Sequence, residues 1–346
     1  MRLLFLPFSV LYGIIVYIRN LFFDLGIFQS KSFNFPIICI GNLSVGGTGK
    51  TPHTDYIITL LKENYNVAVI SYGFGRKTQG YLEVANNSKA EKVGDEPLQL
   101  KQKHLNALVV VDENRRRGIE KIMKNHPEID VILLDDGFQH RSVKAGLNIL
   151  ITDYHLPYYK DFLLPMGTLR ESKKASERAD IIVVSKSPKK INPTEKKGII
   201  QKLGVFITQK CYFSHINYKN WKCLTTNEDL VVDETYSITL VTGIAKPTPL
   251  IKKLEKDGHT VSLMQFADHH NYSKTNAVEI LNKYKQDNSA KKLILTTEKD
   301  AVKLSEFVED FGDTNIYFVP IEATFEDKEN FEKQILNYAR GNKRNG

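Results

Sequence analysis

Residues 44–52, Ser-Val-Gly-Gly-Thr-Gly-Lys-Thr-Pro, have the clearest chemical implication in this chain. An apolar run at 36–40 precedes them, and a helical pattern with apolar residues on one face follows. A strand, a glycine-rich turn and a helix N-terminus together present backbone N–H groups to a polyphosphate. Lys50 is expected to reach the β- and γ-phosphates, and the Thr51 hydroxyl to complete the shell of a Mg²⁺ ion. The predicted nucleotide-binding residues are Ser44, Val45, Gly46, Gly47, Thr48, Gly49, Lys50 and Thr51.

Ser44 stands where the common form of such loops has glycine. The alternative interpretation is a glycine-rich turn that only caps a helix. The intact Gly49-Lys50-Thr51 in a strand–turn–helix context favours the phosphate loop.

A second group of candidate ligands follows the apolar run 131–134, where the chain reads Asp-Asp-Gly-Phe-Gln-His at 135–140. A carboxylate at the carboxyl end of a strand beside a phosphate loop is placed to bind Mg²⁺. An apolar strand ending in aspartate is common by itself, but with the upstream loop it predicts a metal site. Its expected ligands are Thr51, Asp135 and Asp136.

Basic residues follow the strand predicted at 107–111, in the run Asn-Arg-Arg-Arg at 114–117. Arginine beside a transferred phosphoryl group offsets negative charge in the transition state, so Arg115 and Arg116 are candidate catalytic residues. The alternative is a solvated charge run, although cations at a helix start oppose its dipole and so indicate a nearby anion. The later lysine-rich run 186–190 is predicted to be a solvated loop.

Composition restricts the partners and the compartment. The net charge of +8 suits nucleic acid, an anionic membrane or a phosphorylated substrate. The basic residues are scattered and form no recognisable nucleic-acid module, so no nucleic acid is expected, and no protein partner is inferred. The three cysteines form no CxxC pair, which indicates a reduced, cytosolic compartment.

The N-terminus is strongly apolar from Leu3 to Ile18 and is flanked by Arg2 and Arg19. A buried core helix and an in-plane membrane anchor are both compatible with it. The apolar residues surround the predicted helix instead of forming a stripe, and arginines at both ends suit a bilayer interface. The membrane-associated helix is therefore the favoured prediction.

Buried strands alternate with helical patterns from the phosphate loop to about residue 205, which predicts a parallel sheet covered on both faces. The expected fold class is an α/β, P-loop NTPase-like domain with a smaller second α/β domain. The expected ranges are 1–27 for the N-terminal helix, 28–205 for the P-loop domain, 206–236 for a β-type linker, 237–325 for the second domain and 326–346 for a closing helix.

These motifs together resemble the tetraacyldisaccharide 4′-kinase family, the inner-membrane lipid kinases of lipid A biosynthesis. The resemblance rests on residues 44–52 and 135–140. Further matching pieces occur in the same order at 71–76, 94–97, 167–171, 266–270 and 296–300. These pieces span nearly the whole chain, including the apolar N-terminus, and several of them are seldom found elsewhere. Tyr72 departs from the family, whose members often have arginine there.

The resemblance implies transfer of the ATP γ-phosphate, with Mg²⁺, to the 4′-hydroxyl of a tetraacylated glucosamine disaccharide 1-phosphate. It assigns Asp95 as the base and His269 as its partner. By sequence alone, a turn or helix start is the favoured interpretation of Gly-Asp-Glu-Pro at 94–97, and the resemblance reverses this preference. Pairing with a carboxylate is expected to favour the charged imidazolium of His269. Candidate substrate contacts are Arg76, Gln139, His140 and Arg170.

The implied location is the cytoplasmic face of the bacterial inner membrane, with attachment through the N-terminal helix. The main alternative is a membrane-attached ATPase switch of the partition or arsenite-pump type. Those proteins carry a signature lysine directly before the double glycine, and Val45 occupies that position here.

Overall fold

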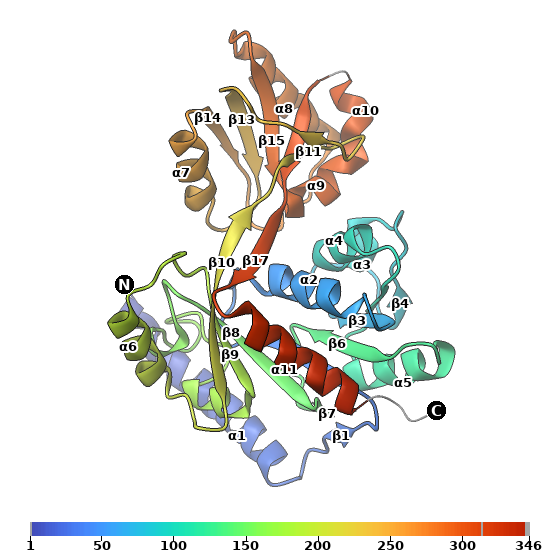
Figure 1. Cartoon of the computed structure of the whole chain (residues 1–346), viewed down its shortest axis with the longest axis vertical. Helices are drawn as coiled ribbons and strands as arrows, with labels where there is room; N and C mark the ends of the chain where they lie inside the picture. Colours follow the sequence, from blue (N-terminus) through green and yellow to red (C-terminus); the bar gives the residue numbers. More distant parts are fainter. Residues whose placement is uncertain (1, 313, 343–346) are drawn as a thin grey trace.

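The computed structural model describes residues 2–312 and 314–342 and contains two large β-sheets (Figure 1). We call the part built on the nine-stranded sheet the first domain and the part built on the six-stranded sheet the second domain. The nine strands lie in the order β17-β10-β9-β8-β2-β6-β3-β5-β4. The inner strands, from β10 to β5 in this order, pair in parallel with one another, whereas the edge strands β4 and β17 pair antiparallel with their neighbours. This arrangement confirms the predicted α/β fold with a mostly parallel sheet.

The first domain is made of the following elements. Its sheet contains β2 (Ile37–Asn42), β3 (Val67–Ser71), β4 (Leu82–Glu83), β5 (Leu108–Val111), β6 (Val131–Asp135), β8 (Leu147–Asp153), β9 (Ile181–Ser185), β10 (Lys210–Tyr218) and β17 (Ile321–Phe325). Its helices are α2 (Lys50–Leu61), α3 (Ala90–Val93), α4 (Asp95–Lys103), α5 (Arg115–Asn125), α6 (Pro193–Leu203) and α11 (Lys328–Gly341). A separate short pair consists of β1 (Lys31–Ser32) and β7 (Val143–Lys144).

Both faces of the first sheet are buried, which explains its continuous apolar strands. In β2 the side chains of Ile38 and Ile40 join one core, while those of Ile37 and Cys39 join the other. Helices α2, α4 and α11 cover the first face, and α5 and α6 cover the second. The sheet is therefore a rigid middle layer that holds the loops at its carboxyl edge.

The second domain has its own sheet, in the order β12-β11-β16-β15-β13-β14. Its strands are β11 (Trp221–Cys223), β12 (Asp229–Leu230), β13 (Ser237–Thr242), β14 (Thr260–Gln265), β15 (Lys292–Thr297) and β16 (Ile316–Val319). Its helices are α7 (Thr248–Lys256), α8 (Lys274–Gln286), α9 (Glu298–Leu304) and α10 (Val308–Phe311).

The connection between the domains differs from the expected ranges. Residues 206–236, expected to form a linker, contain β10 of the first sheet as well as β11 and β12 of the second. Strand β17 lies in the range expected for the second domain but pairs antiparallel with β10 in the first. Together these two strands form the ribbon that joins the domains (Figure 1). Periodicity could not find this pairing because the two strands lie about a hundred residues apart in the chain.

The C-terminal helix α11 packs on the first sheet. Phe331, Ile335 and Ala339 are buried in the same core as the α2 residues, and the Tyr338 hydroxyl donates to the carbonyl of Ile37 at 3.0 Å. The range 326–346, expected as a separate closing helix, thus contributes to the first domain over its described part.

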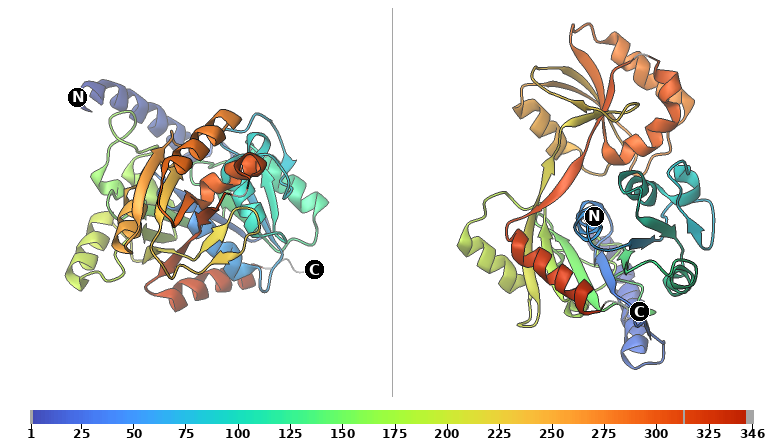
Figure 2. Two further views of the ribbon diagram at one scale, coloured as in Figure 1. Left: turned by 90° about the horizontal axis from the view of Figure 1, so that it is seen from above. Right: turned by 45° about the vertical axis from the view of Figure 1, so that its right-hand side comes forward.

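The N-terminal helix α1 (Leu6–Asp24) runs along the outside of the first domain (Figure 2). By length and composition alone it is apolar enough to cross a membrane. Its inward contacts are polar: Ser9 is buried and donates to the Leu163 carbonyl, and Tyr12 donates to the Arg170 carbonyl at 2.9 Å. Its large apolar side chains are exposed, namely Leu6, Phe8, Val10, Leu11, Ile14, Ile15, Tyr17 and Ile18. A core helix would bury these side chains, so that alternative is wrong.

Candidate active site

The predicted phosphate loop joins β2 to α2, which begins at Lys50. Gly46 and Gly49 have φ angles of 95° and 94°, a left-handed conformation that glycine adopts without steric cost. A side chain at Gly46 or Gly47 would meet open space, so the surface of the loop is accessible. An accessible, glycine-shaped loop at a helix N-terminus suits an anionic ligand.

Three side chains hold the carbonyl groups of this loop. Lys186 Nζ donates to the Gly47 carbonyl, Ser185 Oγ donates to that of Thr48, and His53 Nδ1 donates to that of Gly49 at 2.6 Å. Burial lowers the pKa of His53 to about 4, so the ring is neutral, and its Nε2 accepts from Ser214 Oγ at 2.7 Å. The loop is therefore shaped by the protein itself.

Lys186 differs from its prediction as part of a solvated loop. Besides the Gly47 carbonyl, its ammonium binds Asp153 Oδ2 at 3.0 Å. Lys186 directly follows β9 and has a φ of 57°. Strand β9 pairs with β8, which in turn pairs with β2, the strand before the phosphate loop. Only the position of β9 in the sheet reveals this contact, and the residue type alone gave no signal.

The two aspartates after β6 have different surroundings. Asp135 accepts from Thr54 Oγ1 at 3.0 Å and from Ser71 Oγ at 3.1 Å. Burial, together with the neighbouring charge of Asp136, raises the pKa of Asp135. These hydroxyls orient the carboxylate at the carboxyl edge of the sheet, as the sequence predicted for residue 135.

Asp136 is held by cations. Arg170 binds it with two nitrogens, at 2.7 and 3.1 Å, and Lys50 Nζ lies 3.7 Å from its Oδ2. Burial would raise the pKa of Asp136, but the charges of Lys50 and Arg170 outweigh this and lower it. The structure thus brings Lys50, Asp135, Asp136 and Arg170 together.

Asp95 and His269 meet although they lie in different domains. His269 Nδ1 is 2.9 Å from Asp95 Oδ2, and Lys303 Nζ is 3.1 Å from the same oxygen. Burial alone would raise the pKa of Asp95, but the hydrogen bond from His269 and the charge of Lys303 hold it well below its usual range. Asp95 is therefore an ionised acceptor near neutral pH.

The two ring nitrogens of His269 have different partners. The Asp95 carboxylate accepts from Nδ1–H, so Nδ1 carries the proton. Lys299 Nζ lies 3.0 Å from Nε2, and an ammonium group only donates, so Nε2 accepts. The Phe74 ring packs edge-on against the imidazole, with the ring centres 5.2 Å apart.

The predicted catalytic arginines do not both reach this site. Arg115 is buried and donates to the carbonyls of Asp112 and Asp135, so it ties the ends of β5 and β6 together. Arg116 points outward and pairs with Glu120 at 3.2 Å on the exposed side of α5. The helix turns successive side chains by about 100°, which sends only one of two adjacent arginines inward.

The candidate substrate residues also separate. Arg76 is bound to Glu113 at 2.5 Å and to the Gly80 carbonyl, away from the phosphate loop. Gln139 Nε2 donates to the Asn42 carbonyl at 2.8 Å, directly behind that loop. Burial and the nearby charge of Arg115 lower the pKa of His140 to about 4, so it is neutral.

Sequence reasoning missed Glu96, Lys299 and Lys303. Burial raises the pKa of Glu96, and the charges of Asp135, Lys50 and Asp95 all act on it. Glu96 therefore lies within electrostatic range of both the Asp95 pair and the phosphate-loop group. In the sequence, Glu96 could have been noticed because it directly follows Asp95. Lys299 could have been noticed because it lies in the matching piece at 296–300.

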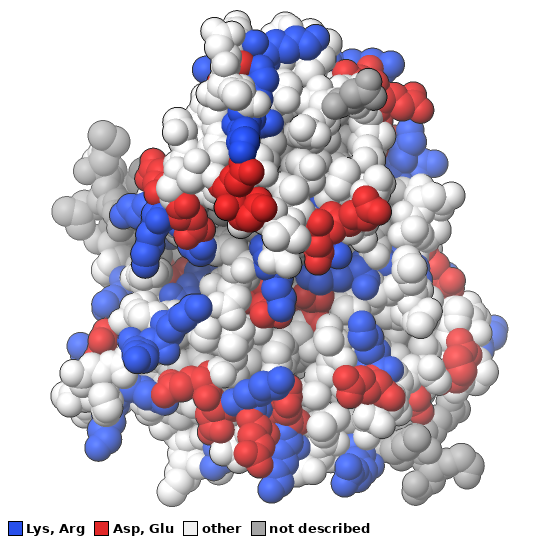
Figure 3. All heavy atoms as spheres, turned by 45° about the horizontal axis from the view of Figure 1, so that its top comes forward, with Lys and Arg blue, Asp and Glu red and all other residues white. Residues whose placement is uncertain are grey.

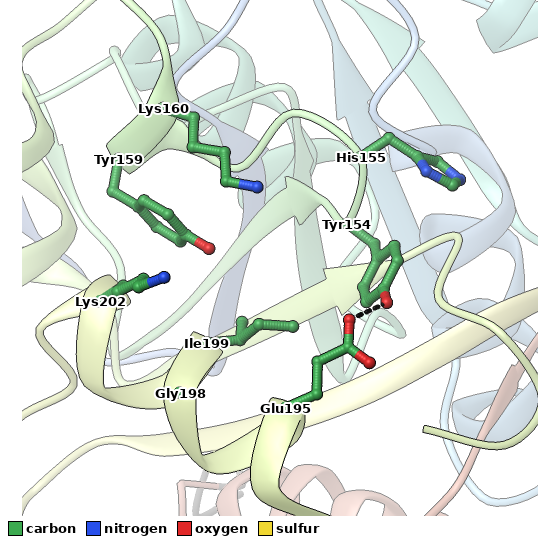
Figure 4. A pocket seen from close by; sticks show the side chains of 8 residues that line it. All are labelled: Tyr154, His155, Tyr159, Lys160, Glu195, Gly198, Ile199 and Lys202. Atoms are coloured by element: carbon green, nitrogen blue, oxygen red, sulfur yellow. Dashed lines mark hydrogen bonds between the residues drawn. The ribbon is translucent and has the colours of Figure 1, made fainter. Parts of the chain in front are cut away.

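A cavity of about 360 Å³ lies apart from this site, between α6 and the segment after β8 (Figure 4). Tyr154 donates to Glu195 across it, and none of the predicted site residues line it. Over the face that Figure 3 shows, basic and acidic side chains are interspersed.

Comparison with known proteins gives consistent matches over the whole chain. The family model described as tetraacyldisaccharide-1-P 4′-kinase matches residues 1–340. A tetraacyldisaccharide 4′-kinase of Bacteroides fragilis is 44% identical over 354 residues, covering 98% of this chain and 94% of that protein. One from Flavobacterium johnsoniae is 42% identical over 347 residues, covering 99% and 98%. A crystal structure of the Aquifex aeolicus protein LpxK in complex with ATP aligns with a TM-score of 0.75 and 31% identity, covering 97% of this chain and 99% of that one.

Proposed function

Because the chain belongs to the tetraacyldisaccharide 4′-kinase family, we propose how its own residues carry out the 4′-kinase step of lipid A biosynthesis. The activity is that of an ATP-dependent kinase. The acceptor is the 4′-hydroxyl of a tetraacylated glucosamine disaccharide 1-phosphate, and the donor is the γ-phosphate of ATP.

The loop 44–51 binds the phosphates of ATP, with Lys50 at the β- and γ-phosphates. Thr51, Asp135 and Asp136 would hold Mg²⁺, which supplies charge neutralisation on the phosphates. Their oxygens fit this ion, and Mg²⁺ needs only one or two carboxylates beside phosphate and water. Among residues 2–312 and 314–342, no group of three acidic, histidine or cysteine side chains could hold a metal by itself, so the ATP phosphates would complete the shell.

Asp95 accepts the proton of the 4′-hydroxyl as the oxygen–phosphorus bond forms and the bond from the γ-phosphorus to the β–γ bridging oxygen breaks, which releases ADP. Its Oδ1 accepts one backbone hydrogen bond, from Glu96 N–H at 3.0 Å, which leaves a lone pair for the hydroxyl. His269 orients the carboxylate through Oδ2. The single observation that carries this assignment is the meeting of Asp95 and His269 at 2.9 Å across the two domains.

Arg170 and Lys50 are the cations that offset charge near the transferred group, a role for which Arg116 is poorly placed. Gln139 and His140 lie on the segment behind the phosphate loop and are kept as substrate candidates, whereas Arg76 is engaged elsewhere.

Helix α1 is the membrane-binding element, on the cytoplasmic face of the inner membrane. Its large apolar side chains are exposed. Moving apolar surface from water into lipid is favourable by about 25 cal/mol of free energy for each Å², so burial of this helix in the membrane is favoured. The same surface lies next to the Arg170 segment through the Tyr12 contact, so an acylated substrate would reach the site from the membrane.

The experiment is a phosphotransfer assay of the purified protein with ATP, Mg²⁺ and the tetraacyl-disaccharide 1-phosphate. Lys50→Met and Asp95→Asn should abolish nearly all 4′-phosphorylated product while the proteins stay folded. Lys62→Met, at the other end of α2, is the matched control and should keep its activity. Wild-type product formation by Asp95→Asn would refute the assignment of the base.

A further inference from the structure

Helix α9 of the second domain brings two lysines to the Asp95–His269 pair. Lys303 Nζ lies 3.1 Å from Asp95 Oδ2, and Lys299 Nζ lies 3.0 Å from His269 Nε2. The two lysines are four residues apart and therefore lie on the same face of the helix. Both members of the pair thus have a cation from α9 as a direct neighbour.

Lys303 and Asp95 are both buried, with side chains about 6% exposed. A buried ammonium group is costly unless a counter-charge satisfies it, and a buried carboxylate has the same requirement. Because His269 and Lys303 share Oδ2, the carboxylate is fixed through that oxygen. The orientation of Oδ1 then follows from the rigid carboxylate plane.

Lys299 is less buried and also binds Asp268 Oδ1 at 3.1 Å. Its contact with Nε2 leaves His269 one hydrogen to donate, the one on Nδ1 that points at Asp95. His269 has a left-handed φ of 58°, a backbone conformation that is uncommon for residues other than glycine. Contacts on both ring nitrogens keep the imidazole in place.

The start of α9 is itself anchored by Asp300, which is completely buried. Its carboxylate accepts from Gly243 N–H at 3.0 Å, Thr297 Oγ1 at 2.6 Å and the Tyr272 hydroxyl at 3.2 Å. These groups come from the ends of β13 and β15 and from the segment before α8. The position of both lysines is therefore set by the second-domain sheet.

We propose that Lys303 and Lys299 are positioning residues for phosphoryl transfer, with Lys303 holding the Asp95 carboxylate and Lys299 holding the His269 ring. This inference rests on the proposed role of Asp95 as proton acceptor. A carboxylate paired with lysine is a weak base, but phosphoryl transfer has a loose transition state and depends mainly on placement. Helix α9 then completes the site when the second domain lies against α4.

The test is the pH dependence of kcat and kcat/KM for Lys303→Met and Lys303→Arg in the full-length protein. The titratable and charged groups that face Asp95 are His269, Lys303 and Lys299 from the second domain and Glu96 on its own helix. Without Lys303, burial raises the pKa of Asp95, so the acidic limb of the profile should move toward neutral pH. We expect kcat to fall about 10- to 100-fold, as for a misplaced catalytic group, with KM for ATP unchanged. Lys303→Arg should restore both readouts.

Lys103→Met is the matched control, because Lys103 also bridges the domains through Asp55 at 2.9 Å and Glu298 at 3.0 Å without touching Asp95. It should leave the acidic limb in place. An unshifted profile in Lys303→Met, or equal losses in Lys303→Met, Lys303→Arg and Lys103→Met, would overturn the inference.

Two further variants keep the outcomes distinct. If Lys303→Met does not fold, Lys299→Met carries the test, and it should lower kcat without changing KM for ATP. Wild-type kcat in Lys299→Met would then contradict the inference. If Asp95→Asn keeps full activity, the proposed function fails. If Asp95→Asn is inactive while the lysine variants behave as wild type, only the inference fails.

Discussion

Replacing Lys186 with methionine removes one of the three side chains that hold the phosphate loop. The ammonium binds the Gly47 carbonyl and Asp153, and methionine keeps the length of the side chain without its charge. The loop should then sample conformations that do not match the phosphates. ATP binding should weaken, because selecting the correct conformation costs free energy.

The magnitude follows from the contacts. A hydrogen bond from a charged donor contributes about 1.5–3 kcal/mol. The Lys186 side chain is 30% exposed, so water compensates part of the loss and the lower end of that range applies. Since about 1.4 kcal/mol corresponds to a factor of ten, we expect the Kd for ATP to rise about tenfold. Asp153 also loses its cation, so its pKa should rise from the lowered value that Lys186 maintains.

The assay is calorimetric titration of each protein with a non-hydrolysable ATP analogue. Lys190→Met, in the same lysine-rich run but exposed, is the control and should bind as wild type does. The thermal midpoint of each variant checks that the fold is intact. An unchanged Kd for folded Lys186→Met would refute the idea that side chains from β9 shape the loop.

Three other outcomes are expected. In a double-mutant cycle of Asp95→Ala and His269→Ala, the double variant should have nearly the kcat of Asp95→Ala alone, because the effects of mutating residues that act as a unit are not additive. If the two losses in kcat multiply, the residues act independently. Deleting residues 1–26 should shift the protein from the membrane fraction toward the soluble one while ATP binding persists, and an aggregated product without ATP binding would contradict α1 as a membrane element. Burial lowers the pKa of His53 from 6.5 to about 4, so the unfolded chain takes up a proton that the folded chain does not, and stability should fall as the pH drops through that interval. His53→Gln should lose less stability over the same interval in thermal unfolding, and identical losses in the two proteins would exclude His53 as the cause.

The phosphate loop and the strand-end aspartates were predictable because their geometry is local. A strand, a glycine-rich turn and a helix that follow one another directly leave little freedom for where Lys50 and Thr51 lie. Asp135 is fixed in the same way, as the last residue of a buried strand that pairs with β2. The strands predicted at 107–111 and 131–134 agree with β5 and β6 to within one residue at each end, since their apolar patterns are short and well bounded.

The remaining features depend on contacts between distant segments. The ribbon of β10 and β17, the loop contact of Lys186 and the outward position of Arg116 follow from pairing and packing that no local pattern encodes. The same holds for the contact between Lys299 and His269 Nε2, because the family resemblance implied only the acidic partner of this histidine.

The sequence by itself determined that this chain binds a polyphosphate at a strand–helix junction and matches one family of lipid kinases, because those motifs are runs of consecutive residues. Only the tertiary structure decided which charges surround Asp95. Its neighbours His269 and Lys303 come from a second domain that the chain enters and leaves through two paired strands. The electrostatic state of the carboxylate is therefore a property of the domain arrangement, since burial and charge act over distances in space and not along the chain.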